Sequence, residues 1–288
     1  MSIFVDEKNK VLVQGATGHQ GVFHIGEMKK FGTNVVAGVT PGKAGQDVQG
    51  VPIFNNIMDA VDETDANTSL ILVPARFAKD AVFEALDAGI KTVVTITENI
   101  PFHDAMDFVH YAKYNNAVLI GPNSPGIASP GKSKIGILPG SIFLEGDVGV
   151  ASRSGTLTYE IVNSLKEKGI GQSTCVGLGG DPIIGTTFID ALDAFEKDNA
   201  TKAVVLVGEI GGTAEEDAAE HIKEYITKPV FAFIAGRTAP PGKRMGHAGA
   251  IIARGKGTAE SKIKAFEKAD VGLAIFPTDI ADLVEKYG

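Results

Sequence analysis

The sequence contains no tryptophan and only one cysteine, Cys175, among its 288 residues. A single cysteine excludes an intrachain disulfide framework and a cysteine-rich metal site, so the simplest expectation is a reducing, cytoplasmic compartment. Aromatic residues make up 7% of the chain, which predicts a mostly aliphatic core. No apolar run approaches the roughly 20 residues of a membrane span, and the first six residues lack a signal-peptide pattern. We therefore expect neither a membrane segment nor a signal peptide.

The chain also lacks an excess of positive charge. Its 27 Lys and Arg residues are outnumbered by 35 Asp and Glu residues, giving a net charge of −8. Nucleic-acid binding requires a cationic surface that displaces counterions, so we expect no nucleic-acid partner. A phosphorylated small molecule stays compatible with this charge, because a few backbone N–H groups and one lysine suffice to bind an anion. No pair among the six histidines has the helical spacing of a metal site, so we expect no metal.

Residues 10–120 alternate short apolar runs with helical patterns. The runs are continuous rather than alternating, as in strands that are buried on both faces. Strand–helix alternation implies right-handed crossovers and a parallel sheet, so residues 1–123 are predicted to form a Rossmann-like domain. The predicted strands are Lys10–Val13, Asn34–Val39, Ser69–Val73, Thr92–Ile96 and Ala117–Ile120, with a helix over Ala78–Ala88.

Residues 124–146 differ in composition, because prolines and glycines recur throughout them. Such a segment makes a poor helix or central strand, and we interpret it as a linker between domains. Strand–helix alternation then resumes over residues 147–288, which predicts a second parallel-sheet domain. Its predicted strands are Val148–Ala151, Gln172–Val176, Ala203–Val207 and Val230–Ile234, and its predicted helices are Gly155–Lys168, Thr187–Phe195, Glu215–Tyr225, Thr258–Lys268 and Asp279–Lys286.

A glycine-rich loop, Gly15–Gly21, follows the first predicted strand and opens a helix. Such a turn directs free N–H groups and the positive helix end at one point, which suits a pyrophosphate. The GxxGxxG spacing departs from the GxGxxG of ordinary dinucleotide folds, and a tight turn without a ligand is the alternative. After the second strand comes Lys43, where an NAD enzyme tends to have an acid. This cation favours a ligand with an additional phosphate, such as NADP or coenzyme A, unless Lys43 is an ordinary surface charge.

Other strand ends are predicted to share that rim, because ligands gather at the carboxyl ends of parallel strands. Glu98 follows one of them and either binds a hydroxyl or amide of a long ligand or caps the next segment. In the second domain, Ser154 stands between a strand and an amphipathic helix. It is either an ordinary N-cap or part of a phosphate cradle at the positive helix end. Glu209 lies among glycines at another strand end, where it either orients an imidazole or is a loop charge.

The most unusual segment is Gly236–Ala250, which contains Lys243, Arg244 and His247. It does not fit a P-loop, because Arg244 stands where a magnesium-binding Ser or Thr is needed. His247 lies between small residues, so its ring is predicted to be accessible, with cationic neighbours suited to a phosphate. A neutral, accessible imidazole is a nucleophile, and an isolated surface histidine is the alternative.

Taken together, these motifs resemble the α subunits of the succinyl-CoA synthetase (succinate–CoA ligase) family. They occur in the family's order along nearly the whole chain, and this order makes the resemblance specific. The matching stretches are Gly15–Gly21, Gly38–Lys43, Ile96–Glu98, Gly121–Asn123, Ser152–Tyr159, Gly179–Pro182, Gly208–Gly212 and Gly242–Ile251. Two positions depart from the family pattern: Ser124 stands where many relatives have cysteine, and Arg76 where proline is common.

The resemblance implies a Rossmann-like CoA-binding domain followed by a flavodoxin-like ligase domain. It implies that coenzyme A binds through the first domain, that Ser154, Gly155 and Thr156 bind phosphate and that Tyr159 lies near the acyl substrate. His247 is implied to become phosphohistidine, with Glu209 steadying the ring. The residues implied to bind CoA are Thr17, Gly18, His19, Gln20, Lys43, Ile96, Thr97 and Glu98.

The implied reaction joins succinate to CoA at the expense of ATP or GTP, through succinyl phosphate and the phosphohistidine, as a step of the tricarboxylic acid cycle. The nucleotide and its magnesium are implied to bind a partner β subunit, in an αβ or α2β2 heteromer. A sister ligase acting on malate, itaconate or another acid would carry the same motifs. An NADP-dependent oxidoreductase would explain the first glycine loop and leave His247 without a role. A CoA-binding module without catalysis would leave His247 inert.

Overall fold

The computed structural model describes residues 2–240, 244–252 and 257–287. The chain forms two compact units of nearly equal extent. The N-terminal unit consists of Phe4–Gly140 with Ile183–Gly185. The C-terminal unit consists of Ser141–Pro182 and Thr186–Gly288, together with Met1–Ile3. Each unit is built around its own sheet, so we describe them one at a time.

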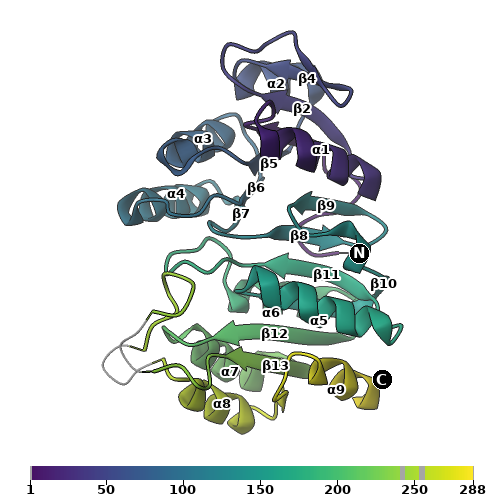
Figure 1. Cartoon of the computed structure of the whole chain (residues 1–288), viewed down its shortest axis with the longest axis vertical. Coiled ribbons are helices and arrows are strands. Elements are labelled where there is room, and N and C mark those ends of the chain that lie inside the picture. Colours follow the sequence, from purple (N-terminus) through teal and green to yellow (C-terminus); the bar gives the residue numbers. More distant parts are fainter. Residues whose placement is uncertain (1, 241–243, 253–256, 288) are drawn as a thin grey trace. The chain divides into compact units, whose positions relative to one another are not determined.

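The sheet of the N-terminal unit has the strand order β3-β4-β2-β1-β5-β6-β7. All neighbours are parallel except the short edge strand β3, which pairs antiparallel with β4. Without β3, the order by position in the chain is 3-2-1-4-5-6, which is the Rossmann arrangement. The Rossmann-like prediction is therefore confirmed (Figure 1). The strands are β1 (Val11–Gln14), β2 (Val35–Val39), β3 (Asp47–Val48), β4 (Val51–Phe54), β5 (Thr68–Ile71), β6 (Thr92–Thr95) and β7 (Val118–Ile120).

Helices cover both faces of this sheet. Helix α1 (His19–Phe31) follows β1, whereas α2 (Ile57–Thr64), α3 (Ala75–Asp87) and α4 (Phe102–Tyr114) pack together with the strands in one apolar cluster. Helix α3 contributes Ala78, Ala81, Val82, Ala85 and Leu86 to that cluster, and all five lie within the helix predicted over Ala78–Ala88. The cluster is almost entirely aliphatic, as expected from the low aromatic content.

The segment 124–146, which we predicted to be a linker, contains regular structure. Strands β8 (Gly126–Ser129) and β9 (Ser133–Gly136) form an antiparallel hairpin, a 3-10 turn covers Gly140–Ile142, and β10 begins at Glu145. The glycines permit this hairpin, because a Cβ on Gly126 would lie 2.1 Å from the carbonyl oxygen of Ile135. Composition alone indicated a connection here, since the same glycines and prolines also suit an irregular segment.

The C-terminal unit contains five consecutive parallel strands in the order β14-β13-β12-β10-β11. By position in the chain this order is 2-1-3-4-5, the flavodoxin-like arrangement. The second half of the fold prediction is thereby confirmed as well. The strands are β10 (Glu145–Ser152), β11 (Gln172–Gly177), β12 (Ala203–Glu209), β13 (Val230–Ala235) and β14 (Gly272–Leu273).

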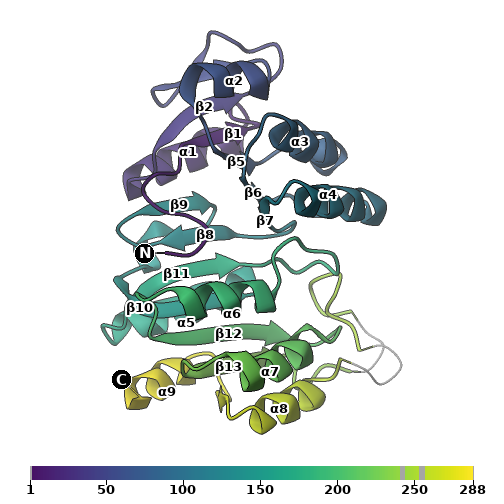
Figure 2. The same cartoon turned by 180° about the vertical axis from the view of Figure 1, so that it is seen from behind.

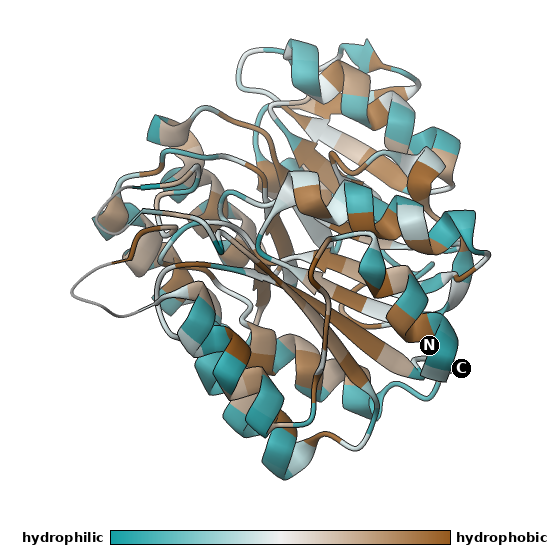
Figure 3. Cartoon of the chain, turned by 60° about the horizontal axis from the view of Figure 1, so that its bottom comes forward, coloured by the Kyte–Doolittle hydropathy of each residue, from teal (hydrophilic) through white to brown (hydrophobic). Residues whose placement is uncertain are grey.

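In this unit α5 (Gly155–Glu167) packs beside α9 (Asp279–Tyr287), and α7 (Ala214–Tyr225) packs between α6 (Phe188–Lys197) and α8 (Ala259–Lys268) (Figures 1 and 2). Figure 3 shows the strands as mainly hydrophobic and the outer faces of the helices as mainly hydrophilic. Among the described residues no helix is both long and apolar enough to cross a membrane. The strand order reverses between β10 and β12, so their carboxyl ends form the place where a ligand is expected.

The glycine loop after β1 is built around close backbone contacts. Gly15 has a φ of +81°, a left-handed conformation that glycine adopts without steric cost. Gly18 precedes α1 and donates its N–H to the carbonyl of Gly15 at 3.1 Å. A Cβ on Gly21 would lie only 2.3 Å from the carbonyl oxygen of Gly15. Gly21 therefore lets the first turn of α1 rest against the loop.

We expect Gly21→Ala to lower the free energy of unfolding by about 1–3 kcal/mol, as is typical of overpacking against a rigid backbone. Gly26→Ala is the matched control on the same helix, because its Cβ would meet only Gln49, at 3.5 Å or more. This control should be neutral or stabilising by up to about 1 kcal/mol, since alanine favours helix more than glycine. Urea denaturation measures both, and equal stability of the two variants would contradict the proposed contact.

Candidate active site

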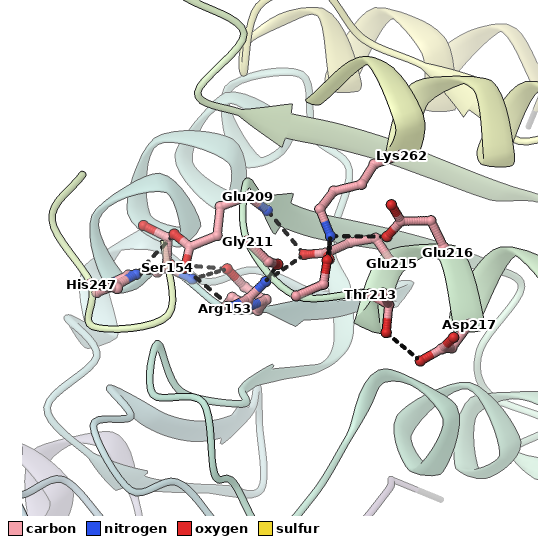
Figure 4. Close-up of polar contacts among 12 residues, drawn as sticks. Arg153, Ser154, Glu209, Gly211, Thr213, Glu215, Glu216, Asp217, His247 and Lys262 are labelled. Atoms are coloured by element: carbon pink, nitrogen blue, oxygen red, sulfur yellow. Dashed lines mark hydrogen bonds and ion pairs between the residues drawn. The ribbon is translucent and has the colours of Figure 1, made fainter. Parts of the chain in front are cut away.

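At the carboxyl ends of β10 and β12, residues that are more than 50 positions apart in the sequence lie close together. Strand β10 ends at Ser152 and is followed by Arg153 and Ser154, and the adjacent strand β12 ends at Glu209. The loop that carries His247 lies against the same edge (Figure 4). This site therefore stands at the switch point of the second sheet.

The central contact joins His247 to Glu209. The Nδ1 atom of His247 lies 2.8 Å from Oε2 and 3.0 Å from Oε1 of the Glu209 carboxylate. A carboxylate only accepts hydrogen bonds, so Nδ1 carries the proton and Nε2 is the nitrogen that Glu209 leaves available. The side chain of His247 is 27% exposed and that of Glu209 is 8% exposed. The buried Glu209 carboxylate thus binds one side of the His247 ring, and the ring remains partly accessible to solvent.

The backbone around His247 forms a tight turn. Met245 donates its N–H to the carbonyl of Ala250 at 2.8 Å, and Arg244 forms a bridge with Ile251. Opposite this turn, a Cβ on Gly180 would lie 2.3 Å from Cγ of the His247 ring. Glycine at position 180 therefore makes room for the imidazole. Lys243, predicted to supply charge here, lies outside the described residues.

The surrounding charges favour the protonated imidazole. The hydrogen bond to Glu209 raises the pKa of His247 above its ordinary value, and the nearby Asp181 adds to this effect. Partial burial and the cation of Arg153 act in the opposite direction without cancelling it. The neutral, nucleophilic ring is therefore the form that gains population as the pH rises.

A buried ion-pair chain lies behind Glu209. The Nη2 atom of Arg153 is 3.5 Å from Oε1 of Glu209, and its Nη1 is 2.9 Å from Oε1 of Glu215. Glu215 in turn pairs with Lys262 of α8, which also reaches Glu216 at 3.0 Å. No role was predicted from the sequence for Arg153, Glu215 or Lys262. Only the position of Lys262 could have indicated a buried charge, because this residue lies on the apolar stripe of α8 with Ala259 and Phe266.

The start of α5 supplies the predicted phosphate-binding residues. The hydroxyl of Ser154 accepts the N–H of Leu157 at 3.4 Å, so Ser154 is the N-cap of this helix. Gly155 and Thr156 form the first turn, where backbone N–H groups are not used within the helix. Tyr159 lies one turn further and is half-buried, and this burial raises the pKa of its phenol, which stays neutral. The N-cap interpretation of Ser154 is confirmed, and a phosphate cradle at the same place stays a prediction.

The residues predicted to bind CoA lie in the N-terminal unit and are linked through Thr40. Both the N–H and the hydroxyl of Thr17 lie 3.3 Å from Oγ1 of Thr40, whose carbonyl accepts the N–H of Lys43 at 3.1 Å. Gly18, His19 and Gln20 are exposed at the start of α1. The exposed Lys43 and the glycine loop therefore belong to one connected surface at the ends of β1 and β2.

An apolar cavity of about 520 Å³ opens beside this surface, at the carboxyl ends of β1, β2 and β5. Its lining includes Gly15, Val39, Pro41, Val73, Pro74 and Phe77. The hydroxyl of Thr97 donates to the carbonyl of Val73 at 2.7 Å, which ties the Ile96–Glu98 segment to the cavity wall. Ile96 is half-buried and Glu98 is exposed. The lining also includes the polar side chains of Gln14, Asp80 and Glu84, so a flat apolar group with polar edges fits this cavity.

The two departures from the family pattern occupy different surroundings. Ser124 is buried, and its hydroxyl accepts the N–H of Gly126 at 2.9 Å, so it stabilises the start of β8. The guanidinium of Arg76 lies 4.7 Å from the centre of the Phe77 ring at the start of α3. Within the described ranges no group of three or more His, Cys, Asp or Glu side chains is arranged to hold a metal ion.

Comparisons with known proteins agree with this division of the chain. Residues 6–99 match the family described as a CoA binding domain, and residues 151–271 match the family described as CoA-ligase. The succinate–CoA ligase [ADP-forming] subunit alpha 2 of Archaeoglobus fulgidus is 60% identical over 284 residues, covering 99% of both chains. The corresponding subunit alpha of Aquifex aeolicus is 56% identical over 288 residues, covering 99% of this chain and 94% of that one.

Among solved structures, the ATP citrate lyase of Methanothrix soehngenii in complex with citrate and coenzyme A has a TM-score of 0.89 at 25% identity. The match covers 99% of this chain and 52% of the lyase, so the present chain spans about half the length of that protein. Near-complete coverage at 56–60% identity, with both family matches in order, shows that the chain belongs to the succinate–CoA ligase α-subunit family, with a CoA-binding domain followed by a CoA-ligase domain.

Proposed function

We propose that this chain is the α subunit of a succinate–CoA ligase in which Nε2 of His247 carries a phosphoryl group during turnover. The observation that carries the proposal is the contact between Nδ1 of His247 and Glu209, at 2.8 Å. This contact fixes the tautomer in which Nε2 has a free lone pair, as a buried carboxylate commonly does for a catalytic imidazole. The ring is therefore prepared for nucleophilic attack on phosphorus.

For the reaction to balance, the phosphoryl group must pass from the nucleotide to His247 and from His247 to the acid. Nε2 attacks the γ-phosphorus of the nucleoside triphosphate, and the diphosphate leaves. The succinate carboxylate then takes the phosphoryl group from Nε2, giving succinyl phosphate and restoring the neutral ring. The CoA thiolate attacks the acyl carbon, and inorganic phosphate leaves as the thioester forms. If the nucleotide phosphorylated the acid directly, thioester formation would release the phosphate and leave none for His247.

The start of α5 is suited to the transferred phosphoryl group. Unused N–H groups of Gly155 and Thr156, the cap residue Ser154 and the positive helix end favour an anion there. These donors would be arranged before the reaction and need no reorganisation as charge develops. We assign Tyr159, in the next turn of the same helix, to the neighbourhood of the acyl group.

Coenzyme A, in this proposal, binds the N-terminal unit. The apolar cavity beside Gly15 would take the adenine ring, and the N–H groups of His19 and Gln20, in the first turn of α1 next to Thr17 and Gly18, would bind the pyrophosphate. Lys43 would pair with the 3′-phosphate, and Ile96, Thr97 and Glu98 would contact the rest of the ligand. Residues 1–123 and 147–288 thus divide the work into thiol binding and phosphoryl transfer.

The complete enzyme requires a partner in this proposal. We assign ATP or GTP and its magnesium to a β subunit, in an αβ or α2β2 heteromer, and we place the enzyme in the cytoplasm as part of the tricarboxylic acid cycle. Succinate is preferred over malate and other acids on the strength of the relatives' names. An acid screen with both nucleotides, on the protein purified with its endogenous partner, distinguishes these substrates.

His247→Asn should fold normally and abolish the acid-labile, base-stable labelling of the chain by radiolabelled ATP or GTP in the heteromer, because Asn offers no nucleophilic ring nitrogen. His103→Asn, at an exposed site on α4 in the other unit, is the control and should label as the parent does. Mass spectrometry then locates the phosphate. Persistent labelling of the His247 variant would overturn the assignment.

Lys43→Ala should weaken CoA binding by about 1–2 kcal/mol, the loss of one charge-assisted contact, or roughly 5- to 30-fold in Kd. The same substitution should weaken the binding of 3′-dephospho-CoA far less, because that ligand lacks the phosphate that Lys43 would contact. Lys113→Ala, which removes an exposed lysine at the end of α4, serves as the charge control. Calorimetry with both ligands measures the effect, and an equal loss for the two ligands would place Lys43 away from the 3′-phosphate.

The labelling rate should fall with decreasing pH around a midpoint above the ordinary imidazole value of about 6.5, because Glu209 raises the pKa of His247 and the protonated ring is not nucleophilic. Glu209→Gln removes the negative charge, so the midpoint should move to lower pH, and the plateau rate should also drop because the ring loses its orientation. Glu220→Gln, at an exposed site on α7, should change neither. A midpoint that stays in place in Glu209→Gln would show that this carboxylate does not control the ring.

A further inference from the structure

Behind the His247–Glu209 contact lies a set of charged side chains that the proposed chemistry does not use. Glu215 and Lys262 are fully buried, and Arg153 is 7% exposed. They come from three different elements: Arg153 follows β10, Glu215 lies in the first turn of α7, and Lys262 lies in α8. Figure 4 shows them as a continuous line of contacts that leads from Lys262 to Glu209 and His247.

The carboxylate of Glu215 is the junction of this line. Its Oε1 accepts the backbone N–H of Glu209 at 3.1 Å and Nη1 of Arg153 at 2.9 Å, and its Oε2 accepts from Lys262. Arg153 in turn places Nη2 at 3.5 Å from Oε1 of Glu209. One buried carboxylate therefore holds the main chain of Glu209 directly and its side chain through Arg153.

The same cations also fix the loop that follows β12. Nη1 of Arg153 donates to the carbonyl of Gly211 at 3.2 Å, and Nζ of Lys262 donates to the carbonyl of Gly212 at 3.1 Å. A Cβ on Gly211 would lie 1.9 Å from the carbonyl oxygen of Gly249, two residues after His247. The loop held by these cations is thus in direct contact with the segment that presents the imidazole.

Stability alone does not explain this series of buried ion pairs. Removing two opposite charges from water costs several kcal/mol per ion, and apolar replacements of buried ion pairs are often neutral or stabilising. Buried ion pairs do fix one geometry, since each partner satisfies the other only in a narrow range of positions. At this place in the fold, the geometry being fixed is that of Glu209.

We propose that the buried chain Lys262–Glu215–Arg153 is a positioning device that holds the Glu209 carboxylate against Nδ1 of His247 and so keeps Nε2 directed at the phosphoryl donor. The proposal rests on the phosphohistidine function proposed above. Lys262, Glu215 and Arg153 act through Glu209 and not by touching the substrate. Their contribution should therefore appear in the phosphoryl-transfer rate and its pH dependence, and not in substrate affinity.

The groups that face the His247 ring set the sign of the pH effect. Glu209 from β12 and Asp181 from the segment after β11 favour the protonated ring, and Arg153 from the end of β10 disfavours it. In the native protein Arg153 pairs with both Glu215 and Glu209. When glutamine replaces Glu215, Arg153 pairs more strongly with Glu209, so the protonated His247 ring loses stabilisation. The labelling midpoint should then move to lower pH.

The test is the double variant Glu215→Gln with Lys262→Met in the complete heteromer, which removes one buried ion pair and leaves no buried charge of that pair unpaired. The control is Glu260→Gln with Lys264→Met, an exposed pair on the same helix with a 2.6 Å contact. We expect the buried-pair variant to label about 10- to 100-fold more slowly, the usual effect of misplacing a reacting group by about an ångström. Its labelling midpoint should fall in pH, its KM for the nucleotide, CoA and acid should stay within about twofold, and the control should match the parent.

An unchanged labelling rate and midpoint in the buried-pair variant would overturn the positioning role, whatever its stability. If that variant does not fold, Arg153→Lys is measured the same way, because lysine keeps the positive charge but has one nitrogen in place of the two that contact Glu209 and Glu215; its rate should fall in the same direction, and a parental rate would again overturn the role. Absence of phosphate on His247 in the parent heteromer would instead refute the proposed function. The two failures are thus distinguishable.

Discussion

The hydrogen bond between the Glu209 carboxylate and Nδ1 of His247 is the interaction on which the C-terminal unit's site depends. The Glu209 residue is only 6% exposed, and its carboxylate has the guanidinium of Arg153 beside it at 3.5 Å. The hydrogen bond also requires a gap for the ring, which Gly180 supplies by lacking a Cβ. The contact thus joins the ends of three strands, β10, β11 and β12, around one imidazole.

Both units place their predicted sites by the same topological rule. In each unit a short segment links the first strand to a helix: Gly15–Gly21 at the end of β1, and Ser152–Ser154 at the end of β10. The free N–H groups at the start of each helix point to the carboxyl edge of the sheet. The order of strands reverses beside β1 in the first sheet and beside β10 in the second. A single principle of parallel sheets therefore underlies two predicted anion sites of different chemistry, one beside an apolar cavity and one beside an accessible histidine.

The sequence allowed most strands to be located within one or two residues, because continuous apolar runs are characteristic of strands covered on both faces. It did not reveal β4, whose Pro52 argues against a strand and is accommodated beside the two-residue edge strand β3. At the site, glycine neighbours indicated His247 and Glu209, because small residues imply accessible corners; this holds for His247, whereas Glu209 is buried at 6% exposure. Glu215 and Lys262 were missed for the opposite reason: charges are expected at the surface, and only their pairing in three dimensions permits complete burial.

Three other potential nucleophiles of the C-terminal unit illustrate why a histidine is suited to the proposed phosphoryl transfer. Cys175 lies fully buried in β11, and burial raises the pKa of its thiol, so it stays protonated and out of reach. Ser154 is used as the cap of α5, and its hydroxyl has no base in contact among the hydrogen bonds described for it. The phenol of Tyr159 is kept neutral by burial. Among these side chains, His247 alone combines a charged partner on one ring nitrogen with an available lone pair on the other, and this asymmetry depends on the buried charges that hold Glu209 in place.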